Sequence, residues 1–178
     1  MKFFLFLFIL PLVCLDINAQ KIKINEVDKF TKKCIIETSF EKINGGITSN
    51  LSYKNVWLAF RRIDNSEFLR IKWCCNAVVS VDKGAEVIFL DADGNTYSFE
   101  NNEYEISDYG EGTVGFAGSG LLGLDLWLIG NCSVLEGKQI KAIRINTNDG
   151  YVDIEISKKA SDKITKTYLV YKKAINHN

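Results

Sequence analysis

The chain has 178 residues and carries 22 basic and 22 acidic side chains, so its net charge at pH 7 is zero. Because these charges are interspersed, the composition offers no electrostatic case for a nucleic-acid partner or for an anionic membrane. The length suits a single domain whose hydrophobic core needs neither a metal nor disulfides.

The N-terminal segment is typical of a secretory signal peptide. Lys2 is followed by the apolar run Phe3–Val13, and a small residue, Ala19, stands at the expected cleavage position. The apolar run falls short of the roughly 20 residues that span a bilayer. We therefore predict a signal peptide over residues 1–19 and an exported domain over residues 20–178, in the periplasm, at the cell surface or outside the cell.

The cysteines leave two interpretations open. Four follow the predicted signal peptide, namely Cys34, Cys74, Cys75 and Cys132. In an exported chain they are compatible with one or two disulfides, for example from Cys34 to one of the others, and equally with buried free thiols. Zinc is disfavoured because there is no C-x-x-C pair and the only histidine is His177. A lipid anchor on Cys14 is disfavoured because Val13, which is not a small residue, precedes it.

Alternation of apolar and polar residues predicts strands through most of the chain. Residues 33–41, 67–75 and 151–157 each alternate in this way, with Glu37 on the charged face of the first run and Arg70 on that of the second. Such alternation is typical of half-buried antiparallel strands whose charged face meets solvent.

Turn residues separate these runs. The Asp-Gly pairs at 93–94 and 149–150 favour tight hairpins, and the Asp-Asn pair at 64–65 favours a further turn. We expect roughly nine to eleven short strands, and therefore a mainly β domain folded as an antiparallel sandwich or open barrel.

Acidic and aromatic side chains gather between residues 100 and 111. The acids are Glu100, Glu103, Glu105, Asp108 and Glu111, and Tyr104 and Tyr109 lie among them. Paired carboxylates can hydrolyse glycosides, whereas histidine-dependent mechanisms have no base outside the C-terminal tail. A solvated acidic loop is the other interpretation.

The run GSGLLG at 118–123 has the G-x-G-x-x-G spacing of a dinucleotide-binding turn. That turn must open a helix whose N-terminus meets the pyrophosphate. Here leucines at alternate positions follow Gly120, which predicts a strand. We therefore expect no nucleotide cofactor, and we expect Gly118, Gly120 or Gly123 to have a positive φ or to face a closely approaching backbone.

The C-terminal segment departs from the β pattern and predicts a helix over about 158–175. Ile164, Tyr168 and Tyr171 recur at helical spacing, and Ser161 is a reasonable N-cap. We expect this apolar stripe to pack on an edge or end of the sheet. Since no linker or repeat interrupts the chain, we predict one domain.

Several of these motifs together resemble a family of uncharacterised exported proteins of the Bacteroidota. The resemblance covers about residues 78–157 and rests on Asp82-Lys83-Gly84, on Tyr104, Ile106 and Ser107, on Gly115–Gly120, and on Arg144, Ile145, Thr147, Asp149, Gly150 and Tyr151. It implies a bacterial exported β domain and brings no activity with it.

The favoured function is a non-catalytic exported binding or surface-interaction domain, with a glycan or another exported protein as partner. The expected ligand-contact residues are Glu103, Tyr104, Glu105, Asp108, Tyr109 and Glu111. The alternative is a carboxylate-dependent hydrolase that acts on polysaccharide or cell-wall material. We expect neither a metal nor a cofactor.

Overall fold

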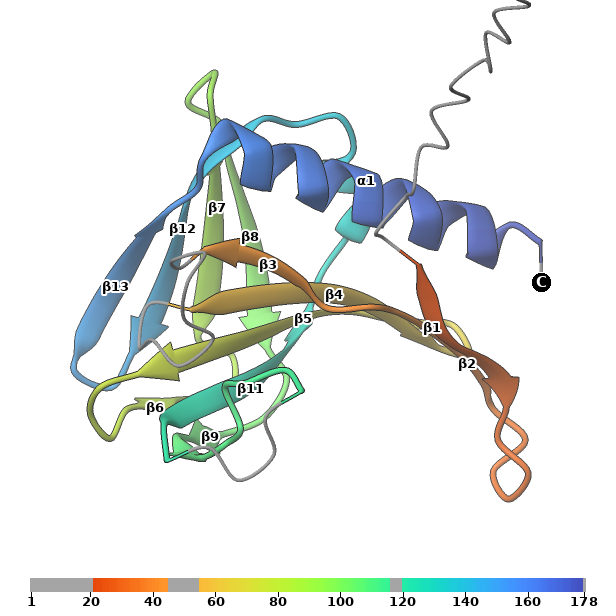
Figure 1. Cartoon of the computed structure of the whole chain (residues 1–178), viewed down its shortest axis with the longest axis horizontal. Coiled ribbons are helices and arrows are strands. Elements are labelled where there is room, and N and C mark those ends of the chain that lie inside the picture. The colour runs from red at the N-terminus through yellow and green to blue at the C-terminus, as the bar shows by residue number, and fades with distance from the viewer. Residues whose placement is uncertain (1–20, 45–54, 116–119, 178) are drawn as a thin grey trace, which may run out of the picture.

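The computed structural model describes residues 21–44, 55–115 and 120–177, and its largest element is an 11-stranded antiparallel sheet (Figure 1). The strands along the main path run in the order β1-β2-β4-β5-β11-β8-β7-β12-β13, with β3 beside β4 and β10 beside β11. A small second sheet pairs β6 with β9. The bounds of the strands are β1 Ile22–Val27, β2 Cys34–Thr38, β3 Glu41–Asn44, β4 Val56–Ile63, β5 Ser66–Cys75, β6 Ser80–Val81, β7 Glu86–Asp91, β8 Thr96–Asn101, β9 Glu105–Ile106, β10 Asp108–Tyr109, β11 Leu122–Ile129, β12 Ile140–Thr147 and β13 Gly150–Glu155.

The main sheet curls so that its β3 and β13 ends approach each other (Figure 1). The side-chain amide of Asn44, at the end of β3, donates to the carbonyl of Glu155, at the end of β13, over 3.0 Å. The mainly β prediction, with an open barrel as one of its forms, is therefore confirmed.

The predicted turns are confirmed at three hairpins. Asp64 turns β4 into β5 with a φ of +52°, a conformation that Asp tolerates better than most residues. Gly94 has a φ of +91° between β7 and β8, and Gly150 has a φ of +121° where β13 begins after β12. Positive φ is the reason for the glycine in both Asp-Gly pairs.

Asp91 organises the turn between β7 and β8. Its carboxylate accepts hydrogen bonds from the backbone N–H groups of Asp93 and Asn95, at 2.9 and 2.8 Å, and from the hydroxyl of Tyr97 at 2.8 Å. Hydrogen bonds from the Asn95 side chain, from Tyr97 and from these backbone groups lower the pKa of Asp91 to about 2. The carboxylate thus belongs to the fold of the hairpin.

The C-terminal α-helix, α1 (Lys158–Ile175), packs across the curled sheet (Figure 1), and its bounds match the predicted 158–175. The Ile164, Tyr168 and Tyr171 stripe is buried, as predicted. The ring centroid of Phe60, from β4, lies 5.4 Å from that of Tyr168 and 5.6 Å from that of Tyr171. Aromatic contacts therefore anchor the helix to β4.

The predicted N-cap at Ser161 is wrong, because Ser157 caps the helix. The Ser157 hydroxyl accepts from the Ala160 N–H at 3.3 Å. Ser161 lies one turn further on and is buried, and its hydroxyl accepts from the N–H of Ile140 at 2.8 Å. Ser161 therefore satisfies the first residue of β12 rather than the helix end.

All four cysteines of the predicted exported domain are free thiols, so of the two interpretations left open the structure has the one without disulfides. Cys34 is half-buried, and the other three are buried. The predicted signal peptide, with Cys14, lies outside the described residues. Within the described ranges, no helix has both the length and the apolar character that a membrane span requires.

Candidate functional site

Residues 103–111 contain the predicted ligand contacts and are called here the acidic–aromatic segment. Hydrogen bonds hold this segment at three points, which are β9, Ser107 and β10. On β9, Glu105 and Ile106 pair with Val81 and Ser80 of β6. On β10, Asp108 and Tyr109 pair with Gly123 and Leu122 of β11.

Between these two short strands lies Ser107, which is buried. Its N–H donates to the carbonyl of Val79 at 2.8 Å, and its hydroxyl accepts from the N–H of Val79 at 3.0 Å. The backbone that carries the exposed side chains of the segment is thus hydrogen-bonded on both sides of Ser107.

Three large apolar side chains of the acidic–aromatic segment face solvent. Tyr109 is 67% exposed, and Tyr104 and Ile106 are each about half exposed. Glu103, Asp108 and Glu111 are exposed too. Sequence reasoning missed Ile106 as a contact residue, although it lies within the same segment, two positions after Tyr104.

The acids of this region form a local negative field around Glu105. Burial, and after it the charges of Glu103, Asp125 and Glu111, raises the pKa of Glu105 above its ordinary value. Three of the predicted acids, Glu103, Glu105 and Glu111, therefore lie near one another, together with Asp125 of β11. Glu100 lies instead on β8, where it pairs with Glu86 of β7.

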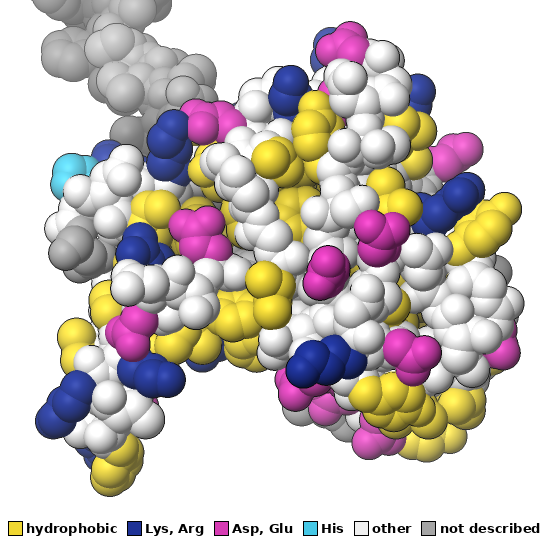
Figure 2. All heavy atoms as spheres, turned by 180° about the vertical axis from the view of Figure 1, so that it is seen from behind, with side chains coloured by type: hydrophobic (Ala, Val, Ile, Leu, Met, Phe, Trp, Pro, Cys, Tyr) yellow, Lys and Arg dark blue, Asp and Glu magenta, His cyan; other side chains and the backbone are white. Residues whose placement is uncertain are grey.

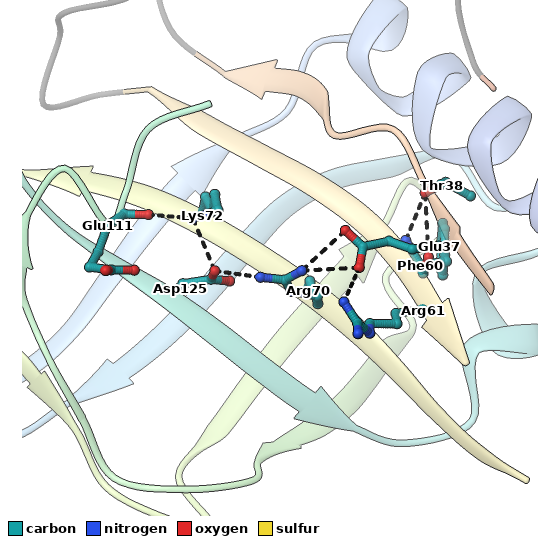
Figure 3. A network of polar contacts seen from close by, with 8 residues as sticks. All are labelled: Glu37, Thr38, Phe60, Arg61, Arg70, Lys72, Glu111 and Asp125. Atoms are coloured by element: carbon teal, nitrogen blue, oxygen red, sulfur yellow. Dashed lines mark hydrogen bonds and ion pairs between the residues drawn. The ribbon is translucent and has the colours of Figure 1, made fainter. Parts of the chain in front are cut away.

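Asp125 belongs to a row of charges that crosses four neighbouring strands, called here the charge ladder (Figure 3). Its members are Glu37 from β2, Arg61 from β4, Arg70 and Lys72 from β5, and Asp125 from β11. Arg70 binds both carboxylates: one of its nitrogens lies 3.1 and 3.2 Å from the two carboxylate oxygens of Glu37, and the other donates to Asp125.

The charge ladder continues to the acidic–aromatic segment. Lys72 lies 3.0 Å from Asp125 and donates to the backbone carbonyl of Glu111 at 2.8 Å (Figure 3). At the other end, Arg61 donates to Glu37. The segment is therefore tied to β5 by a side-chain hydrogen bond and to β11 by backbone pairing.

The strand alternation placed Glu37 and Arg70 on a solvent face, and this expectation is wrong. Glu37 is only 1% exposed and Arg70 only 8%. Aromatic rings cover the guanidinium of Arg70, whose central carbon lies 4.2 Å from the ring centroid of Trp127 and 5.1 Å from that of Phe40. Charges can be buried in this way when they are paired and stacked.

Two glycines bring the end of the acidic–aromatic segment into contact with the sheet. A Cβ on Gly123 would lie 2.8 Å from the carbonyl oxygen of Trp73 and closer still to Gly112, and a Cβ on Gly112 would lie 2.7 Å from the carbonyl carbon of Trp73. The prediction of close backbone approach is confirmed at Gly123. Gly118 lies outside the described residues, and Gly120 has open space around its Cβ position.

The strand prediction after Gly120 is also confirmed, since Leu122–Ile129 is β11. A dinucleotide-binding turn leads into a helix whose N-terminus receives the pyrophosphate, whereas this run of glycines leads into a strand. The glycine at 123 serves close packing of backbones instead.

Two buried thiols of the domain are protected from reaction. Cys74 is buried, its Sγ lies 3.2 Å from the carbonyl of Gly112, and burial raises its pKa to about 11. Burial also raises the pKa of Cys132, to about 12. Thiols with such pKa values are poor nucleophiles at neutral pH. Among the described residues, no three His, Cys, Asp or Glu side chains gather as a metal-binding group.

A pocket of about 360 Å³ lies apart from the acidic–aromatic segment, between β13 and the ends of β3, β4 and β5. Trp73 and Val152 supply apolar wall, and Asn44 and Asp153 supply polar wall. Two of these polar groups already have partners, because Asn44 donates to β13 and Asp153 pairs with Arg144 at 2.7 Å. The acidic–aromatic segment is therefore the stronger candidate site.

Comparison of the chain with protein families, with curated proteins and with solved structures yields no significant match.

Proposed function

We propose that this chain is a non-catalytic exported binding domain that contacts a glycan through its acidic–aromatic segment. One observation carries the proposal: Tyr104, Ile106 and Tyr109 are exposed on a backbone that is hydrogen-bonded to β6 and β11. Export itself is inferred from the predicted signal peptide at 1–19 and from the resemblance to exported Bacteroidota proteins.

Tyrosine is suited to this role for two physical reasons. Its rigid ring offers a large amphipathic contact at a small cost in conformational entropy. Because the backbone at Tyr109 and on both sides of Ser107 is already paired, little further ordering is needed on binding. The carboxylates of Glu103, Asp108 and Glu111 add acceptors for the hydroxyl groups of a sugar.

The test is saturation-transfer NMR with soluble bacterial polysaccharides, using the protein from Gln20 onward. Tyr104→Ala and Tyr109→Ala should each weaken the affinity obtained from the titration by at least about tenfold, the loss expected when an aromatic side chain is a binding hot spot. Tyr151→Ala is the matched control, since Tyr151 is equally exposed but lies on β13. Equal losses in all three variants, or no saturable binding by the parent protein, would reject the proposal.

One observation favours the alternative, a carboxylate hydrolase. A carboxyl group whose pKa is raised can act as a general acid, and Glu105 is such a group beside the ion-paired Asp125. The measurement is release of reducing ends from polysaccharide or cell-wall material. Hydrolysis would be established if the Glu105→Gln variant lost this activity and the Glu100→Gln variant kept it. Glycan binding without release of reducing ends would support the binding domain instead.

A further inference from the structure

We propose that the tip of the β1–β2 hairpin is a docking site for an anionic lipid bilayer. The hairpin projects from the body of the molecule (Figure 1), and its protruding end carries both basic and hydrophobic side chains in the rear view (Figure 2). This surface lies at the β1 edge of the sheet, on different strands from the acidic–aromatic segment.

The apolar part of the tip is unusually exposed. Phe30 is 83% exposed and Val27, at the end of β1, is 63% exposed. Single exposed apolar residues are common on protein surfaces. An aromatic side chain at the very end of a projecting hairpin is different, because it can enter another phase without the rest of the domain having to rearrange.

The loop holds Phe30 in place. A carboxylate oxygen of Asp28 accepts from the N–H groups of Phe30 and Thr31, at 3.0 and 2.6 Å, and from the Thr31 hydroxyl at 2.9 Å. The backbone of Asp28 closes the loop by donating to the Lys33 carbonyl and accepting from the Lys32 N–H, each at 2.8 Å. Phe30 is therefore presented by an ordered turn.

The tip is also basic. Lys29, Lys32 and Lys33 flank Phe30 and are all exposed. They outnumber the two acids at this end of the hairpin, Glu26 and Asp28, and the Asp28 carboxylate accepts hydrogen bonds from the N–H groups of its own turn. The zero net charge of the whole chain conceals this local excess, which is what an anionic surface would meet when the tip approaches it first.

An anionic bilayer matches both features at once. Aromatic side chains partition into the boundary between headgroups and acyl chains, while lysines remain at the level of the anionic headgroups. Each lysine near such a surface increases binding by about fivefold, and the increase falls within a Debye length. The combination predicts weak, salt-sensitive, reversible docking by the hairpin alone.

The experiment measures co-sedimentation with vesicles of phosphatidylcholine that contain 30% phosphatidylglycerol, with pure phosphatidylcholine as comparison. The protein begins at Gln20, which keeps every described element and removes the apolar run that would bind lipid by itself. Binding should be specific for the anionic vesicles. Replacing Lys29, Lys32 and Lys33 together by Gln should weaken it by about 100-fold, and Phe30→Ala by about tenfold.

Matched controls separate the hairpin from general effects. Lys158, Lys159 and Lys166 of α1 are exposed, and their joint replacement by Gln removes the same charge. Leu169→Ala removes an exposed apolar side chain from the same helix. Both controls should retain binding, and all variants should retain the parental melting temperature.

Three results would overturn the proposal: equal binding to neutral and anionic vesicles, equal losses in the helix controls, or no binding to anionic vesicles at low salt. Binding to soluble polyglutamate without binding to vesicles would assign the hairpin to an acidic protein partner instead. The Tyr104 and Tyr109 variants should bind vesicles normally, so this test is independent of the proposed glycan site.

Discussion

Substitution of Glu37 by Gln removes one charge from the centre of the charge ladder while keeping the shape of the side chain. Glu37 is almost fully buried and accepts from both Arg70 and Arg61. Loss of one member of a buried ion pair costs about 3–5 kcal/mol, because the remaining charge stays desolvated. Arg70 keeps Asp125 as a partner, and the side chain of Arg61 is 18% exposed. We therefore expect the lower end, a loss of about 3 kcal/mol.

The assay is urea unfolding at pH 7, supported by thermal unfolding. For a domain of this size a loss of about 3 kcal/mol lowers the melting temperature by roughly 6–12 °C. Asp153→Asn is the matched control, since it makes the same acid-to-amide change in a pair with Arg144 that is about half exposed on both sides. Water screens that pair, so its loss should be much smaller.

A double-mutant cycle tests the mechanism itself. The double variant Glu37→Gln/Arg61→Gln should lose about 1–2 kcal/mol less than the sum of the two single losses, because either substitution alone already breaks the ion pair between these two residues. A Glu37→Gln loss no larger than that of Asp153→Asn would refute the argument that burial sets the size of the effect. Strict additivity in the cycle would refute the pairing.

Three further predictions concern other parts of the fold. Gly123→Ala should destabilise the protein by about 1–3 kcal/mol because its Cβ would collide with backbone, whereas Gly120→Ala should be nearly neutral; equal urea midpoints for the two variants would contradict this. Hydrogen bonds lower the pKa of Asp91 to about 2, so the folded state holds its proton less tightly than the unfolded chain, and the stability gained is present above about pH 4 and lost as the pH falls towards 2. Asp91→Asn should remove this dependence in calorimetry between pH 4 and pH 2, and an unchanged acid limb would exclude Asp91 as its source. Finally, the native protein from Gln20 onward should react with N-ethylmaleimide at Cys34 alone, which is half-buried beside a surface pocket, and mass spectrometry showing a rapid second adduct would count against the burial of the other thiols.

Local patterns in the sequence predicted much of the secondary structure. Alternation with a period of two predicted strands such as β5 and β11, and the Asp-Gly pairs predicted the hairpins at Gly94 and Gly150. The spacing of Ile164, Tyr168 and Tyr171 predicted α1 and its buried face. These features succeed because strand, turn and helix geometry depends on residues that are near neighbours in the chain.

The acidic–aromatic segment was predicted only in part. Its composition singled out the tyrosines and acids, but composition does not say that Ser107 anchors the segment to Val79 or that Lys72 holds the carbonyl of Glu111. Those contacts join residues that are 28 and 39 positions apart in the chain. These long-range hydrogen bonds hold the backbone of the segment in one conformation, and the composition of the segment does not reveal them.

The sequence by itself thus determined the mainly β class, the turns and the C-terminal helix, while the tertiary structure alone decided which charges are buried. The sequence predicted that Glu37 and Arg70 face solvent, because each lies on the opposite face of its strand from the apolar residues. The register of β2 on β4, and of β5 on β11, sets Glu37 against Arg61 and brings Arg70 between Glu37 and Asp125, 33 and 55 residues away. Alternation in the sequence shows that a strand has an apolar face and a polar face. The neighbouring strands determine whether the polar face contacts water or contacts other charges beneath aromatic rings.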